Sequence, residues 1–340
     1  MASIRDVAKK AGVSVATVSR YLNDPDKVAK KSAAEVDKAI KQLKYKPNLL
    51  ARNFFKSRSY SVLVLVPDIA NPFFSRVIRG IEDVGQQNGY AVLLGDTRYS
   101  PDREAEYYRR VETRQAEGVI QLGPTYPGDL DAYRPGMPFV NACECLPGVP
   151  YPTVNIDNAD AAKQVVQHLI SLGHKRIGCV MGPYDPKNPS PITGDRLRGY
   201  KKALKAAGID FDPKLLAPGD FTLQSGLDAA GYFFNLPSLP TAVFCMNDEM
   251  AVGLIKGVKE KGLRVPQDLS IAGFDDIEFA KFSDPPLTTI SQPTEQIGRK
   301  AMEVLCHLLE GKESGVSRHS LPTLLVVRES TAPPRKTRPR

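Results

Sequence analysis

The chain has 340 residues, a net charge of +8 and 42% hydrophobic residues, which is enough apolar material for roughly two or three domains with a sizeable core. It contains no run of about 18 apolar residues and no apolar leader, so neither a membrane span nor a secretory signal peptide is expected. The five cysteines are scattered, and Cys143-Glu-Cys145 lacks the spacing of a metal site. We therefore expect reduced, mostly buried thiols in a cytoplasmic protein without metal or cofactor.

Residues 3–22 predict two short helices with a turn at Gly12 between them. In the first helix the apolar residues recur with helical spacing, and Ser3 precedes it as a cap. A second serine, Ser14, is expected to cap the second helix, which runs through Leu22. Two helices joined by a tight glycine turn form a helix-turn-helix, whose second helix enters the DNA major groove. The alternative is an ordinary helical hairpin within a larger fold.

The distribution of charge favours a DNA-binding helix-turn-helix over an ordinary helical hairpin. Residues 1–60 hold 14 Lys/Arg and 5 Asp/Glu, a net charge of +9, whereas the rest of the chain has a net charge of −1. A basic small module beside a near-neutral large one predicts a polyanionic partner for the small module only. On the second helix, the side chains left facing outward are Val15, Ala16, Ser19 and Arg20.

A third helix over about 30–44 completes a three-helix unit, so residues 1–46 form the predicted headpiece. Pro47 ends that helix, and residues 47–60 form a connector with a short helix over 49–56. Leu50 and Phe54 share one face of this helix, and that face has no core of its own.

From Ser61 onward, buried strands alternate with helices, which predicts two doubly wound α/β lobes with parallel sheets. The expected strands are 61–68, 90–96, 118–123, 138–142, 176–182, near 218–221, 241–248, 269–276, 287–292 and 320–330. The expected helices are 72–88, 102–115, 158–172, 194–207, 222–234, 249–261 and 294–310. Ligands of such sheets bind beyond the carboxyl ends of the strands. Of the polar residues there, Asn158 and Asp248 are interpreted as helix caps.

Two other classes of protein are weighed against a DNA-binding regulator. An enzyme is disfavoured because no G-x-G-x-x-G follows a strand, and neither a P-loop nor a G-x-S-x-G is present. The four histidines form no evident catalytic or metal set, and His174 is expected to serve a turn. A secreted solute-binding protein is disfavoured by the missing signal peptide and the basic headpiece.

Eight segments together resemble the lactose- and purine-repressor family of bacterial regulators, from about residue 2 to about residue 331. They are DVAKKAGVSVATVSR, YKPNLLAR, VPDIANPFF, SLGHKRIGCVMGP, GDRLRGYKKAL, PTAVFCMNDEMAVG, VPQDLSIAGFDD and DPPLTTISQP. Within the family, VPDIANPFFSRVIRGIE, GDFT and DPPLTTISQP look most like the cytidine and purine repressors. The resemblance implies a homodimer on double-stranded operator DNA, with a headpiece, a hinge helix and a core like a periplasmic binding protein.

The same resemblance divides the core, residues 61–332, into two lobes. The N-lobe is expected over about 61–157 and 290–321, and the C-lobe over about 158–289 and 322–332. The basic tail 333–340 has no apolar residue to fold around and is predicted to be disordered. It also lacks an apolar heptad for a coiled coil, so we expect a homodimer formed by the lobes rather than a tetramer.

The resemblance places base-reading residues at Val15, Ala16 and Arg20. Arg can pair bidentately with guanine, and small apolar side chains can touch a thymine methyl. Phosphate contacts are expected from Ser14, Thr17 and Asn23. The hinge helix implied by the resemblance contains Leu50 and inserts a wedge into the minor groove. The wedge position falls on Phe54, where the family has Leu.

The effector positions implied by the resemblance are Phe73, Phe74, Asn141, Arg196, Phe221, Asn247 and Asp275. The charged pair Arg196 and Asp275 suits the vicinal hydroxyls of a ribose, and the aromatic rings suit a flat base. The sequence thus predicts a ligand-controlled repressor, with a nucleoside favoured as effector and a sugar or a purine base as alternatives.

Overall fold

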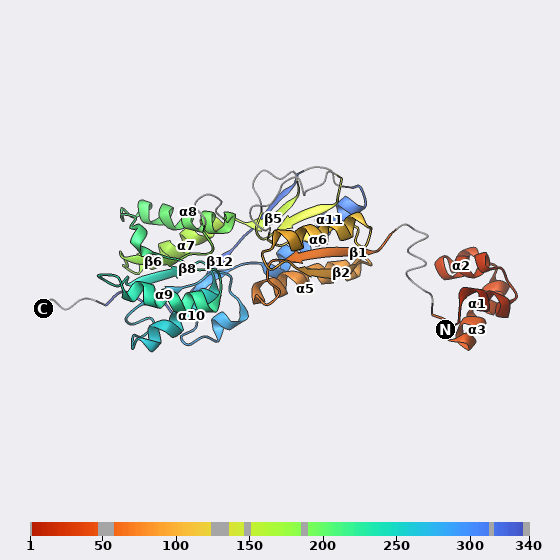
Figure 1. Ribbon diagram of the computed structural model, residues 1–340, viewed down its shortest axis with the longest axis horizontal. Helices are drawn as coiled ribbons and strands as arrows, with labels where there is room; N and C mark the ends of the chain where they lie inside the picture. Colours follow the sequence, from red (N-terminus) through yellow and green to blue (C-terminus); the bar gives the residue numbers. More distant parts are fainter. Residues whose placement is uncertain are drawn as a thin grey trace. The chain divides into compact units, whose positions relative to one another are not determined.

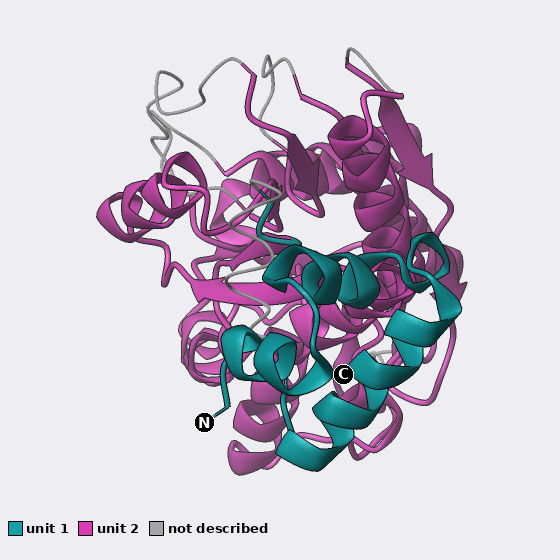
Figure 2. Ribbon diagram, turned by 90° about the vertical axis from the view of Figure 1, so that its right-hand side faces the viewer, with its two compact units in different colours: residues 1–60 teal, residues 61–340 magenta. Residues whose placement is uncertain are grey.

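The computed structural model describes residues 2–46, 58–123, 136–145, 151–184, 190–312 and 316–335. The chain forms two compact units, whose boundary falls between Tyr60 and Ser61 (Figure 2). Each helix in the described part of the chain is too short or too polar to cross a membrane.

The first unit is a helix-turn-helix with a third helix packed against it. It contains α1 (Ile4–Ala11), α2 (Val15–Asn23), the 3-10 helix η1 (Pro25–Lys27) and α3 (Lys30–Leu43). Ser3 and Asp6 form a capping box, and Gly12, with φ of 65°, ends α1 in the left-handed conformation. The small core consists of Val7, Ala8, Val18, Val36 and Ala39. The expected hinge helix, with Leu50 and Phe54, lies outside the described residues.

The second unit begins with a six-stranded parallel sheet in the order β11-β5-β4-β3-β1-β2. Its strands are β1 (Ser61–Val66), β2 (Ala91–Asp96), β3 (Val119–Gln121), β4 (Phe139–Ala142), β5 (Thr153–Ile156) and β11 (Arg318–Leu321). Its helices are α5 (Pro72–Gln87), α6 (Pro101–Glu112) and α11 (Thr294–Leu309). Alternate residues of β1 belong to two different apolar clusters, one with α5 and α11 and one with α6. Both faces of this sheet are therefore covered, and we call this part the N-lobe.

The C-lobe is built around a four-stranded parallel sheet in the order β7-β6-β8-β9. Its strands are β6 (Ile177–Val180), β7 (Leu216–Ala217), β8 (Ala242–Cys245) and β9 (Ser270–Ala272). Its helices are α7 (Asn158–Ser171), α8 (Pro191–Ala206), α9 (Leu223–Phe234) and α10 (Asp248–Glu260), with the 3-10 helices η3 (Pro213–Leu215) and η4 (Glu278–Lys281). Helices α7 and α8 cover one face of the sheet, and α9 and α10 cover the other (Figure 1). The two lobes confirm the predicted doubly wound architecture.

The chain crosses between the lobes on an antiparallel pair, β10 (Thr289–Ser291) and β12 (Leu324–Val326). The prediction of one strand over 320–330 is therefore wrong, because this stretch forms β11 and β12 in two different sheets. Pro322 stands between them, and proline has no N–H to continue a ladder. The sequence did not predict β5. The strand expected near 218–221 lies earlier in the chain, as β7, and it ends before Pro218 and Gly219, which disfavour a strand.

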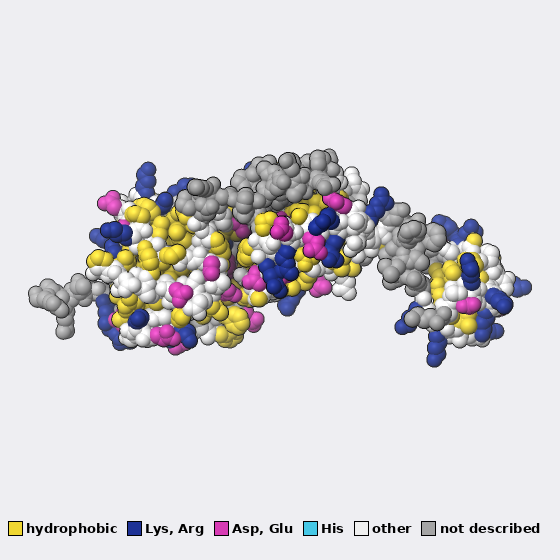
Figure 3. Space-filling model, in the orientation of Figure 1, with side chains coloured by type: hydrophobic (Ala, Val, Ile, Leu, Met, Phe, Trp, Pro, Cys, Tyr) yellow, Lys and Arg dark blue, Asp and Glu magenta, His cyan; other side chains and the backbone are white. Residues whose placement is uncertain are grey.

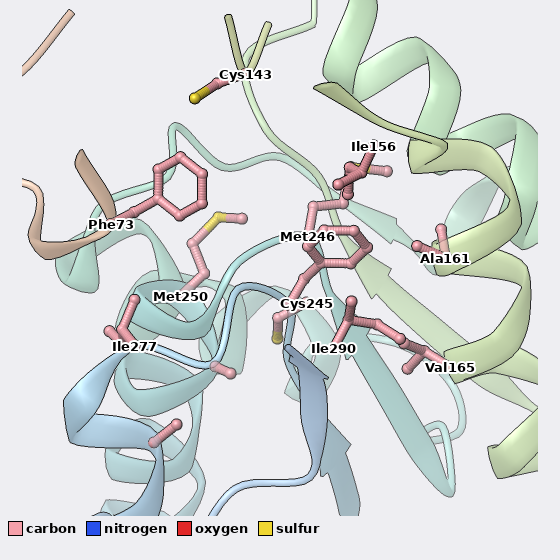
Figure 4. Packing of buried hydrophobic residues seen from close by; sticks show 14 of the residues in the cluster. Phe73, Cys143, Ile156, Ala161, Val165, Cys245, Met246, Met250, Ile277 and Ile290 are labelled. Carbon is pink, nitrogen blue, oxygen red and sulfur yellow. The ribbon is translucent and has the colours of Figure 1, made fainter. Parts of the chain in front are cut away.

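One apolar cluster extends through both lobes. Figure 4 shows part of it, with Phe73 and Cys143 contributed by the N-lobe and Met246 and Met250 by the C-lobe. Four cysteines are buried, Cys145 is partly buried, and all five are free. The interpretation of the cysteines as mostly buried is confirmed.

The residues after β12 are held against the C-lobe. Ser330 donates to the carbonyl of Ile271 at 2.6 Å, the ring of His174 hydrogen-bonds the carbonyl of Ala332 at 2.9 Å, and Arg335 pairs with Asp268 at 2.7 Å. The prediction of a disordered tail from residue 333 is therefore wrong for 333–335. Local composition could not reveal this, because the contacts come from segments far away in the sequence.

Two histidines of the C-lobe, His168 and His174, are expected to make the stability of the fold depend on pH. Burial lowers the pKa of both His168 and His174 below the ordinary value of 6.5. The unfolded chain then binds more protons than the folded chain, so the free energy of unfolding decreases as the pH falls below 6.5. We expect the urea midpoint to decrease between about pH 7 and about pH 5.5, and to decrease less in His174→Gln. His307→Gln, at an exposed position of α11, is the control. If His307→Gln made the midpoint as insensitive to pH as His174→Gln does, the assignment of the pH dependence to His174 would be contradicted.

Candidate functional site

A cavity lies between the two lobes. Six of the seven predicted effector residues line it: Phe73, Phe74, Arg196, Phe221, Asn247 and Asp275. Asn141 does not, because it is fully buried within β4 and its carbonyl accepts a hydrogen bond from Cys145 Sγ at 3.6 Å. The role of Asn141 in effector binding therefore stays a prediction.

Other lining residues were not predicted: Pro67, Asn71, Tyr99, Leu122, Cys143, Glu144, Asn158, Ile192 and Gln292. Most of them follow a strand; for example, Tyr99 lies after β2, Glu144 after β4 and Gln292 after β10. The carboxyl ends of strands are the general location of ligands in such sheets, and this signal could have found them.

Strained backbone conformations gather around the cavity. Four lining residues other than glycine have positive φ: Tyr99 at 54°, Cys143 at 65°, Phe221 at 70° and Asp275 at 121°. Such conformations cost free energy and persist mainly where a site requires them. Their presence here makes the cavity a candidate functional site.

The charged pair at the base of the cavity is held in a fixed arrangement. Arg196 of α8 is 4% exposed, donates from Nε to Asn158 Oδ1 at 3.0 Å and packs over the ring of Phe274. Its Nη2 lies 3.7 Å from Asp275 Oδ1, which also accepts from Gln292 Nε2 at 2.7 Å. Burial raises the pKa of Asp275 to about 6, although Arg196 and Gln292 oppose the shift.

Several polar atoms of this group are left for a ligand. Among the described residues, Asp275 Oδ2 and Gln292 Oε1 have no hydrogen-bond donor, and Asn158 Nδ2 has no acceptor. With Arg196 Nη2, they provide acceptors and donors close together. A pair of neighbouring hydroxyl groups needs that combination, because each hydroxyl both donates and accepts.

The aromatic wall is positioned by its neighbours. Asn247 Nδ2 donates to the carbonyl of Phe221 at 2.8 Å, while Asn247 Oδ1 caps α10 by accepting from the N–H of Met250 at 2.9 Å. Asn247 therefore orients Phe221 and has little left for a ligand. A Cβ on Gly182 would lie 2.1 Å from Phe221 Cζ, so the ring rests against a glycine backbone.

The interpretation of Asn158 and Asp248 as helix caps is wrong by one residue. The caps of α7 and α10 are Asp157 and Asn247. Asn158 binds Arg196, and Asp248 accepts from the hydroxyl of Thr289 at 2.6 Å. Asn158 lines the cavity and Asp248 is fully buried, and local sequence cannot distinguish these positions from capping.

The exposed face of α2 is the second candidate site. Val15 is 41% exposed, and Ala16 and Arg20 are exposed beside it. Within the described residues the guanidinium of Arg20 has no hydrogen bond or ion pair. Ser14 caps α2 by accepting from the N–H of Thr17, and Asn23 donates to the carbonyl of Ser19. Figure 3 shows Lys and Arg side chains around this unit.

Comparison with known proteins identifies two matched regions of the chain. Residues 3–48 match the model of bacterial regulatory proteins of the lacI family, and residues 166–331 match that of a periplasmic binding protein-like domain. The HTH-type transcriptional repressor CytR of Escherichia coli (strain K12) is 44% identical over 332 residues, covering 97% of this chain and 96% of that protein. The ribose operon repressor of the same strain is 33% identical over 339 residues, 97% of this chain and 100% of that protein.

Solved structures lead to the same family. The lac repressor dimer bound to operator and the anti-inducer ONPF superimposes with a TM-score of 0.86 at 28% identity, covering 97% of this chain and 99% of that one. The chain therefore belongs to the lacI family of bacterial regulatory proteins, DNA-binding transcriptional regulators that respond to small-molecule effectors.

Proposed function

We propose that this protein is a cytoplasmic, homodimeric repressor whose operator binding is controlled by a nucleoside held between its two lobes. The observation that carries the proposal is the cavity itself, which combines a diol-sized set of donors and acceptors around Asp275 with the rings of Phe73, Phe74 and Phe221. A nucleoside matches both parts, whereas a free sugar leaves the rings without a partner. A free base leaves the Oδ2 atom of the buried Asp275 carboxylate without a hydrogen-bond donor, which is costly.

The headpiece is proposed to bind the operator through α2. Val15, Ala16 and Arg20 would read bases, and Ser14, Thr17 and Asn23 would hold phosphates. Leu50 and Phe54 are proposed to belong to a hinge helix that forms on DNA, because so short a helix is marginal in isolation.

Calorimetry on the purified protein tests the effector. Cytidine, adenosine, ribose and adenine are titrated separately, and each is then added to the protein bound to an operator selected from random DNA. We expect one nucleoside to bind more tightly than ribose or adenine and to change operator affinity. Tight binding of a free pentose or hexose, without binding of any nucleoside, would favour a sugar-responsive repressor. The similarity to the ribose operon repressor makes ribose the first sugar to test for this alternative.

Exposed apolar residues support the proposed homodimer. Leu93 and Leu94 are 42% and 44% exposed on β2, an edge strand, and Phe279 and Phe282 are 61% and 72% exposed on the C-lobe. Apolar side chains gathered on a surface mark interfaces, and an open sheet edge invites pairing. We expect sedimentation at micromolar concentration to give a dimer, and Leu94→Glu combined with Phe282→Glu to shift it toward monomer. A stable tetramer would contradict the proposal.

Gly182→Ala is expected to weaken nucleoside binding about tenfold, the order of one lost base–aromatic stack. The added Cβ would displace the tip of the Phe221 ring, which can move without disturbing the fold. Gly231→Ala is the matched control, because a Cβ there meets no atom within 4 Å. Calorimetry with a nucleoside compares the two variants; equal affinity would show that the ring position is irrelevant.

A further inference from the structure

The side chain of Glu144 crosses the cleft between the lobes. Glu144 follows β4 of the N-lobe, and its Oε1 accepts a hydrogen bond of 2.6 Å from the hydroxyl of Ser190, at the start of α8 in the C-lobe. The carboxylate also accepts from the backbone N–H of Ile192, in the first turn of that helix. One N-lobe carboxylate thus binds two groups of a C-lobe helix.

The first turn of α8 otherwise lacks a side-chain cap. Ser190 occupies the cap position but makes no capping hydrogen bond. The other C-lobe helices α7, α9 and α10 are capped by their own residues Asp157, Thr222 and Asn247. The N-terminus of a helix presents unpaired N–H groups and a partial positive charge, both of which favour a carboxylate. Glu144 supplies from the opposite lobe what α8 lacks.

Helix α8 also carries Arg196, one turn beyond Ile192. Arg196 lies near enough to Glu144 for the two charges to attract each other. Burial raises the pKa of Glu144, while its hydrogen bonds with Ser190 and Ile192 oppose that shift. The Glu144 side chain is partly buried beside the cavity, where hydrogen bonds to the carboxylate are stronger than in water.

We propose that Glu144 is a positioning residue for the effector: by capping α8 across the cleft, it holds the lobes together and sets Arg196 in place. The proposal rests on the cavity being the effector site, but not on the effector being a nucleoside. When the lobes separate, Glu144 leaves α8 and the helix end loses its cap. Closure of the cleft and the position of Arg196 are thereby coupled.

Hydrogen–deuterium exchange on the full-length protein without effector tests the cap directly. Glu144→Ala is expected to speed exchange of the first-turn amides of α8 by about tenfold, the order of one lost charged hydrogen bond. Glu144→Gln should restore part of the protection, because its amide oxygen can still accept a hydrogen bond from the helix end. Glu303→Ala removes an exposed N-lobe carboxylate that pairs with Lys300 within α11, and it should leave α8 unchanged. Unchanged exchange in Glu144→Ala would overturn the proposal.

A double-mutant cycle tests the coupling to the effector. Cytidine is the probe, with ribose as the second ligand in case the protein responds to a sugar. Glu144→Ala and Ser190→Ala should each weaken binding, and the double variant should be no weaker than Glu144→Ala. Additive losses would show that the two residues act separately and would refute the cap. If neither ligand binds the unsubstituted protein, the proposed nucleoside function fails while the exchange experiment still decides the role of Glu144.

Discussion

Arg20→Ala is expected to cost about 1–3 kcal/mol of operator affinity and to relax base choice at one position. Arg20 lies on the exposed face of α2, and its guanidinium has no partner among the described residues. It is therefore available for a bidentate pair with guanine, and its loss removes interactions that depend on one base. Fluorescence anisotropy at fixed salt, with selected operator and with random DNA, measures the difference.

Lys46→Ala is the matched control for Arg20→Ala. Lys46 is an exposed cation of the same unit, and a phosphate contact from it would weaken binding to all DNA alike. Equal losses on operator and random DNA for Arg20→Ala would rule out base reading by Arg20.

Asp275→Asn is expected to weaken nucleoside binding by about 10- to 100-fold while changing base binding little. The substitution removes an anionic acceptor from the place where hydroxyls are proposed to bind, next to Arg196 and Gln292. Asp276→Asn is the control, because Asp276 pairs with Arg328 at 2.6 Å and does not line the cavity. Calorimetry with nucleoside, free base and ribose separates the effects. An equal loss of base and nucleoside affinity would refute the hydroxyl role.

The pH dependence of nucleoside binding follows from the same carboxylate. The pKa of Asp275 is raised to about 6 by burial, and only the ionised form accepts hydrogen bonds at both oxygens. Nucleoside affinity should therefore be full above about pH 7 and decrease as the pH falls through 6. Asp275→Asn should remove that part of the pH dependence.

The local sequence determined the elements that are stabilised by near neighbours. The capping pair Ser3 and Asp6, the left-handed Gly12 and the cap Ser14 all act within four residues, so the helix-turn-helix could be predicted completely. The buried strands of the core could also be predicted, because strands covered on both faces form continuous apolar runs.

Only the tertiary structure determined which residues distant in the sequence contact one another. Asn158 binds Arg196 rather than capping a helix, Asn141 is fully buried in β4, and residues up to Arg335 are held by the C-lobe. Glu144 is the clearest case, since its partner Ser190 lies 46 residues further along the chain and in the other lobe. Composition and periodicity report which residues prefer burial, but the partner of a buried polar group depends on which segments the fold brings together.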